Sequence, residues 1–178
     1  MKTIAITVLL LLTSVSTLAQ EPLTTVASIN VPRYMGTWYE IAKYPNWFQR
    51  KCVSNTSAQY SAQPDGTVRV QNRCTQEDGQ VKEAIGQARQ LGASGSPKLE
   101  VRFAPEWLSF LPFVWGDYWV IDLDTDYQLV AVSEPKREYL WVLSRTPTVS
   151  AKAYDELLVR LRAKSMDTSK LERTRQGG

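Results

Sequence analysis

The chain of 178 residues is long enough for a single domain, and with 43% hydrophobic and 22% charged residues it has the composition of a globular protein, which excludes extensive disorder. A net charge of +3, with Lys and Arg scattered along the chain, excludes the basic surface of a nucleic-acid-binding protein but allows a weak attraction to anionic membranes. The sequence has no histidine, which removes the commonest general base and most transition-metal sites, so we expect no metal, no cofactor and no enzymatic activity.

Residues 1–19 have the pattern of a secretory signal peptide. Lys2 precedes an apolar run at residues 4–12, and Thr17-Leu18-Ala19 fits a cleavage site of small residues. The run is short for a bilayer span, and the alternative, a buried N-terminal helix, would show a polar face. No cysteine follows the run, where a bacterial lipoprotein would be acylated. We therefore expect a soluble mature domain, residues 20–178, in the periplasm or outside the cell.

Eight short strands are predicted after this segment. They are residues 37–44, 53–61, 68–74, 80–90, 99–103, 117–123, 128–133 and 139–144. The links between several of them, such as QPDG and QEDG, are short and polar and contain Gly or Pro, which favours antiparallel neighbours. No segment of helical period interrupts the series, which argues against a βαβ fold.

The pattern changes after the last strand. Tyr154, Leu157, Leu158 and Leu161 recur at helical spacing, and Ser150 is a suitable N-cap. Eight up-and-down strands leave no unpaired edge strand when they close into a barrel. The fold class is therefore all-β, an eight-stranded antiparallel up-and-down β-barrel, with one C-terminal α-helix packed on its outside because so small a barrel cannot contain it.

Three separated motifs resemble those of the lipocalin family. They are GTWYEI at residues 36–41, TDY at 125–127 and LSRTP at 143–147, and they occur in the family's order. The resemblance is closest to bacterial lipocalins of the outer-membrane type and to apolipoprotein D, although the lipidated cysteine of the outer-membrane members is absent. It implies a closed barrel end where Arg145 covers Trp38, and it assigns structural roles to Gly36, Trp38, Thr125, Asp126, Tyr127 and Arg145.

Alternate loops of an up-and-down barrel lie at opposite ends, so the remaining loops surround the predicted open mouth. Two of these loops are rich in aromatic residues: Trp47 and Phe48 in one, and Trp107, Phe110, Phe113 and Trp115 in the other. Such residues either pack on one another over the mouth or form an apolar entrance for a ligand.

Cys52 and Cys74 are the only cysteines, and both fall near the mouth, on neighbouring strands. In an oxidising compartment we expect a disulfide between them, with a reactive free thiol as the alternative.

Alternation of side chains predicts the inner wall. If Trp38 points inward, so do Glu40, Ala42 and Tyr44, and if Arg145 does, so do Leu143, Trp141 and Tyr139. Tyr118 and Val120 are placed inward by the resemblance. Glu40 either pairs with a neighbour near the barrel floor or faces the ligand. The predicted ligand contacts are Glu40, Tyr44, Trp47, Phe48, Phe113, Tyr118, Val120, Tyr139 and Trp141.

The resemblance implies an exported carrier of small lipophilic ligands, such as fatty acids or lysophospholipids, in membrane lipid transport or maintenance. Two alternatives stay open at this point. One is an enzyme on the same barrel that uses a thiol at the mouth, and the other is a protein that binds a partner through its aromatic loops.

Overall fold

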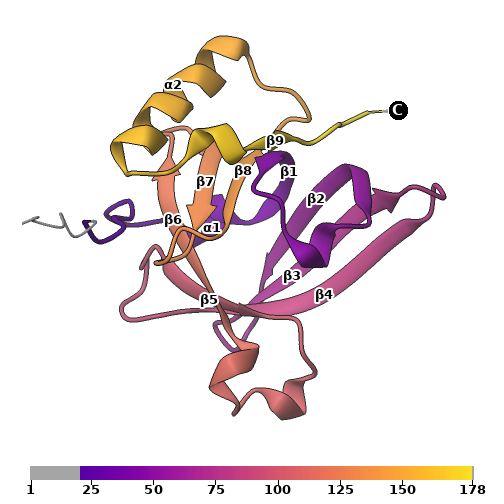
Figure 1. The fold of residues 1–178 in the computed structure, drawn as a ribbon. Coiled ribbons are helices and arrows are strands. Elements are labelled where there is room, and N and C mark those ends of the chain that lie inside the picture. Colours follow the sequence, from indigo (N-terminus) through magenta and orange to yellow (C-terminus); the bar gives the residue numbers. More distant parts are fainter. Residues whose placement is uncertain (1–20, 178) are drawn as a thin grey trace, which may run out of the picture.

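A computed structural model describes residues 21–177 and contains all eight predicted strands (Figure 1). The predicted signal peptide lies outside the described residues. The strands are β1 (Gly36–Lys43), β2 (Cys52–Ala62), β3 (Val68–Gln76), β4 (Val81–Gln90), β5 (Lys98–Arg102), β6 (Gly116–Leu123), β7 (Leu129–Ser133) and β8 (Leu140–Ser144). Each pairs antiparallel with its neighbour in sequence. In the described part of the chain, no helix has the length and apolarity to cross a membrane.

The first strand closes the barrel. One edge of β1 pairs with β8, with Glu40 opposite Leu143, and its first half pairs on the other edge with β2, with Trp38 opposite Ala58. Its second half pairs instead with a short ninth strand, β9 (Glu172–Arg173), which the sequence did not predict. The predicted eight-stranded antiparallel barrel is confirmed, with this one addition.

Two hydrophobic clusters lie on the two faces of the barrel wall. The inner cluster includes Trp38, Val120 and Leu143, and the outer cluster includes Val142 and Ile121 together with the buried residues of helix α2. Alternation along β8 explains the division, because Val142 and Leu143 are neighbours that point to opposite faces.

Helix α2 (Ala151–Ala163) covers the outside of the barrel, as predicted (Figure 1). The Ser150 side chain accepts a hydrogen bond from the backbone N–H of Ala153 and caps the helix. Leu157 and Leu161 are fully buried in the outer cluster. Arg160 donates two hydrogen bonds of 2.9 Å to the carboxylate of Asp122, which fastens the exposed side of the helix to β6.

The prediction that Ala42 and Tyr44 face inward is wrong. The register between β1 and β8 shifts between Glu40 and Ala42, which marks a β-bulge. The bulge reverses the alternation, so Ala42 and Tyr44 both belong to the outer cluster, and the Tyr44 hydroxyl donates to the backbone oxygen of Asp167. Tyr44 is therefore no longer among the proposed ligand contacts.

Arg145 closes one end of the barrel, as the resemblance implies. Its guanidinium carbon lies 3.9 Å from the centre of a ring of Trp38, which is fully buried. The same group donates to the backbone oxygens of Thr37, Arg33 and Tyr127 at 2.9, 2.6 and 3.3 Å. One side chain thus stacks on the floor of the barrel and joins three separate chain segments above it.

The other motif residues surround this arginine. Gly36 has a φ of +96°, and a Cβ there would lie 3.2 Å from Nη1 of Arg145, so both the backbone and the space favour glycine. The Tyr127 hydroxyl accepts from the N–H of Asn30, and the backbone oxygen of Thr125 accepts from Arg33. Asp126 contributes its backbone to the turn rather than its carboxylate.

Two features of the closed end were missed by sequence reasoning. Asp124 holds the turn, because its carboxylate accepts from the N–H groups of Asp126, Gln128 and Leu129. The short helix α1 (Val31–Tyr34) begins at Asn30, whose side chain accepts from the N–H of Arg33.

Replacing Arg145 by Ala is expected to lower the free energy of unfolding by about 2–3 kcal/mol, because a cation–π contact and hydrogen bonds to three carbonyls are lost together. Denaturant melts measure this effect. Arg73→Ala is the control, since Arg73 makes a solvent-exposed ion pair with Glu83 and such pairs contribute at most about 1 kcal/mol. Binding of a ligand should survive, because Arg145 lies at the closed end. Unchanged stability with lost binding would contradict this assignment of the two ends.

Candidate functional site

The barrel interior is the candidate site, and its wall has one side of small residues. On β4, Ala88 belongs to the inner cluster, and alternation places Gly86 and Ala84 on the same face. Phe103 covers Gly86, because a Cβ there would lie 2.8 Å from the Phe103 ring. The opposite side carries Tyr118, Val120 and Trp141 of β6 and β8, which pack against or belong to the inner cluster, as predicted. A wall that combines aromatic residues with residues lacking long side chains suits an apolar ligand.

Three tyrosines meet inside the barrel. The Tyr118 hydroxyl lies 2.8 Å from that of Tyr34 and 3.1 Å from that of Tyr60, and the Tyr34 and Tyr60 rings are stacked 5.8 Å apart. Burial is the main reason why the pKa of Tyr60 is raised to about 12 and why the pKa values of Tyr34 and Tyr118 lie well above the usual value. We call these residues the tyrosine cluster.

Sequence reasoning found only Tyr118 of this cluster. A signal for Tyr60 was present, because it lies two residues from Ala58 on a predicted strand and shares its inward face. Tyr34 gave no such signal, because it reaches the interior from helix α1, which was not predicted.

Glu40 lies above the floor and is held by its neighbours. It is 2% exposed, and its carboxylate accepts from the Thr174 hydroxyl at 2.6 Å and from the Gln49 amide at 2.7 Å. Burial raises the pKa of Glu40, while these two hydrogen bonds and the charge of Lys43 act in the opposite direction. Glu40 was expected either to pair with a neighbour near the floor or to face the ligand. The geometry matches the first of these, with the neutral donors Thr174 and Gln49 as the neighbours.

The C-terminal tail, residues 172–177, supplies one of these donors. It fills the gap where β1 and β2 separate. There the backbone oxygen of Arg175 accepts from the N–H of Asn55, and the Gln176 side-chain amide donates to the backbone oxygens of Glu40 and Thr56. Asn55 has a φ of 52° at an irregularity of β2, which opens the strand edge to the tail. The polar residues of the tail gave no hint of this role, because long-range pairing leaves no local pattern.

The loop between β1 and β2 folds toward the barrel wall. The Phe48 ring lies 5.7 Å from that of Tyr139 and 6.1 Å from that of Trp141, so the structure brings these three predicted site residues together. Trp141 donates to the Gln49 side chain at 2.9 Å, which links the loop to the strand and, through Gln49, to Glu40. Trp47 packs edge-on against Phe48 but remains 72% exposed.

Cys52 and Cys74 form the predicted disulfide. It joins the end of the β1–β2 loop to β3 and closes a segment with a sequence separation of 22. The chain-entropy model gives such a crosslink about 3 kcal/mol. With the disulfide formed, neither sulfur is a free thiol, so Cys52 and Cys74 do not offer the thiol nucleophile that the enzyme alternative requires.

The loop between β5 and β6, residues 103–115, projects away from the barrel, on the side remote from α2 (Figure 1). Its Trp107, Phe110 and Phe113 side chains are 73%, 76% and 80% exposed. Trp115 fastens the base of the loop, because its indole N–H donates to Ser109 and Arg89 lies 4.1 Å above one of its rings. The structure therefore places Phe113, a predicted ligand contact, on an outward-facing surface.

Comparison with known proteins agrees with this architecture. A family described as "Lipocalin-like domain" matches residues 29–176. The chain belongs to the lipocalin family. This lipocalin is 42% identical to temperature-induced lipocalin-1 of Arabidopsis thaliana over 153 residues, which cover 85% of this chain and 81% of the relative. It is 38% identical to outer membrane lipoprotein Blc of Escherichia coli K12 over 156 residues, with 87% and 84% covered.

More distant lipocalins match over a similar length. Apolipoprotein D of Rattus norvegicus is 30% identical over 153 residues, which cover 81% of this chain and 75% of the relative. Insecticyanin of the tobacco hornworm Manduca sexta has a TM-score of 0.64 at 19% identity and covers 84% of this chain and 82% of its own, which supports the fold alone. The family and the barrel expected from the three motifs are thus confirmed.

The pH dependence of stability should report the burial of Glu40. Because burial raises its pKa above the usual 4.5, protonation favours the folded state. This stabilisation is complete below about pH 4.5 and is lost as the pH rises through the raised pKa. The free energy of unfolding of the wild type should therefore fall over this window, and Glu40→Gln should reduce the fall. Denaturant melts between pH 4 and 8 measure it.

Thr174→Val should change the pH dependence in the opposite direction to Glu40→Gln. The Thr174 hydroxyl bond lowers the pKa of Glu40, so its loss should extend the fall in stability to higher pH. Identical pH profiles for the wild type and Glu40→Gln would contradict the assignment of Glu40.

Proposed function

We propose that this lipocalin is an exported carrier that holds a fatty acid, a lysophospholipid or a similar amphiphile in its barrel and serves membrane lipid transport or maintenance. The observation that carries the proposal is the inner wall, where the small residues Ala84 and Ala88 of β4 share the interior face with aromatic residues of β6 and β8. We expect an apolar chain to lie along this wall with its polar head group near the mouth. Two of the relatives are named as an outer membrane lipoprotein and an apolipoprotein, which supports a role close to lipids.

The expected affinity follows from the length of chain that is buried. Each methylene removed from water contributes about 0.8 kcal/mol, so a chain of about twelve carbons reaches micromolar affinity after the costs of association. Trp141 is placed to report binding, because it is partly buried on the inner face and touches Phe48 of the mouth loop.

Affinity for a series of fatty acids from about C8 to C18 should rise with chain length until the barrel is full and should then level off. Titration with intrinsic fluorescence as the signal measures this. Trp141→Phe should preserve binding but remove most of the fluorescence change, whereas Trp107→Phe, on the exposed loop, should leave the change intact. A flat series, or no saturable binding, would rule out the lipid-carrier function.

The exposed β5–β6 loop suggests where the carrier meets its lipid source. Trp107, Phe110 and Phe113 are three exposed aromatic residues on a loop whose base is fixed. Aromatic side chains of this kind insert into the interface of a bilayer. We extend the proposal to peripheral contact with a membrane through this loop.

Replacing Phe110 and Phe113 together by Ser should weaken binding to phosphatidylglycerol–phosphatidylcholine vesicles by about tenfold or more, because the apolar area that enters the bilayer is lost. Vesicle co-sedimentation measures this. Val159→Ser is the control, since Val159 is exposed on helix α2, away from the loop. Equal binding by both variants would favour the alternative in which the loop contacts a protein partner.

A further inference from the structure

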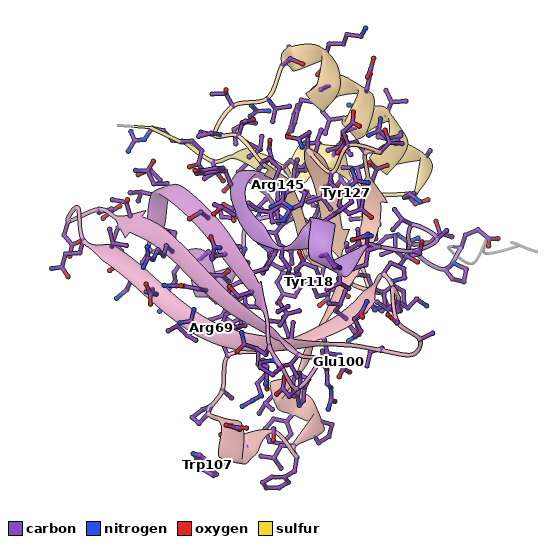
Figure 2. The ribbon with its side chains drawn as sticks, turned by 180° about the vertical axis from the view of Figure 1, so that it is seen from behind. Arg69, Glu100, Trp107, Tyr118, Tyr127 and Arg145 are labelled. Carbon is purple, nitrogen blue, oxygen red and sulfur yellow. A yellow bond between two sulfur atoms is a disulfide. The ribbon has the colours of Figure 1, made fainter. Side chains whose placement is uncertain are left out.

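The tyrosine cluster is a polar site inside an otherwise apolar interior. Tyr34 and Tyr60 are 3% and 7% exposed, and the three rings belong to or pack against the inner cluster. Figure 2 shows Tyr118 near the centre of the molecule, below Arg145 and Tyr127 of the closed end. Core packing alone would be served equally well by phenylalanine at these positions, so the hydroxyl groups require an explanation.

The number of protons in the cluster gives that explanation. Three hydroxyl groups carry three protons, and the two hydrogen bonds among them use two. Whichever way the bonds point, one proton remains without an acceptor within the cluster. Burial raises the pKa values of all three groups, so the cluster stays protonated at neutral pH and the remaining group acts as a donor.

The free donor is accessible from the interior. When Tyr34 and Tyr60 both donate to Tyr118, which bridges them, the free proton is that of Tyr118, which is only partly buried, unlike Tyr34 and Tyr60. An acceptor on a ligand favours this arrangement over those that leave the proton on Tyr34 or Tyr60. A buried donor that lacks an acceptor is unfavourable by a free energy comparable to that of a lost hydrogen bond, and an acceptor supplied by a ligand relieves this penalty.

A charged acceptor does not suit this position. Arg145 is the cation whose charge acts on Tyr34 and Tyr60, and its guanidinium already donates to the carbonyls of Thr37, Arg33 and Tyr127. A carboxylate or phosphate at the cluster would lose its hydration without gaining a free counter-ion. The acceptor is therefore an uncharged oxygen.

We propose that the tyrosine cluster binds an uncharged oxygen at the buried end of the ligand, so that this lipocalin prefers amphiphiles whose apolar chain ends in a hydroxyl or carbonyl group. The inference rests on the proposed lipid-carrier function and specifies the ligand class further. The charged head group lies at the mouth, and the chain runs along the inner wall that the small residues of β4 share with the aromatic residues of β6 and β8.

Matched ligand pairs test this preference. Dodecanoic, tetradecanoic and hexadecanoic acids are each compared with the same acid carrying a hydroxyl on its last carbon, so that contacts at the mouth cancel. In the wild type, at least one hydroxy acid should bind as tightly as its parent. In the Tyr34→Phe/Tyr60→Phe/Tyr118→Phe variant the ratio of the two dissociation constants should shift by about tenfold or more against the hydroxy acid, because its hydroxyl is buried without a partner.

The control is Tyr60→Phe, because the two remaining hydroxyls share one bond and still leave one free donor. It should keep the preference of the wild type. The same ratio in the wild type and the triple variant at every chain length would overturn the inference while leaving the carrier function intact. No saturable binding of any acid by the wild type would overturn both.

An infrared measurement on the wild type does not depend on how well the variants fold. A fatty acid with a ketone on its penultimate carbon, when bound, should show a ketone C=O band shifted to lower frequency than in hexane, as expected for a carbonyl that accepts a hydrogen bond. A band at the hexane frequency for each chain length would also overturn the inference.

Discussion

The stack of Arg145 on Trp38 is the contact on which the rest of the barrel depends. Trp38 fills the floor, and Arg145 ties the end of β8 to β1, to helix α1 and to the turn before β7. With one end sealed in this way, a ligand has a single direction of entry. The loops at the opposite end are then free to serve recognition, because the floor does not rely on them.

Between floor and mouth, the interior contains polar groups at two depths. The tyrosine cluster lies near the floor and consists of neutral hydroxyls. Glu40 lies on the same strand as Trp38, one inward position further along, and its carboxylate is occupied by Thr174 and Gln49. Gln49 also accepts from Trp141, so the mouth loop and the Glu40 site are joined by continuous hydrogen bonds. A movement of Gln49 would therefore be felt both by Trp141 and by Glu40.

The sequence predicted what depends on local periodicity. Strand alternation, turn residues and the Ser150 cap located all eight strands and helix α2 to within a residue or two, and three motifs located the closed end. Alternation failed at the bulge after Glu40, because one extra residue reverses every later side chain, and Tyr44 was misplaced for that reason. Of the polar residues in the interior, Tyr118 and Glu40 were predicted. Tyr34 and Thr174 were not, since they reach the interior from segments without strand periodicity.

The position of the C-terminal tail bears on the order in which the barrel is completed. Thr174 donates its N–H to the backbone oxygen of Ile41, and Gly177 donates to the Asn55 side chain, so residues 174–177 fill the seam beside the first strand. Contacts so distant in sequence form late, because the entropy of closing a long loop has to be overcome before they contribute. The seam between β1 and β2 is therefore the part of the barrel expected to close last.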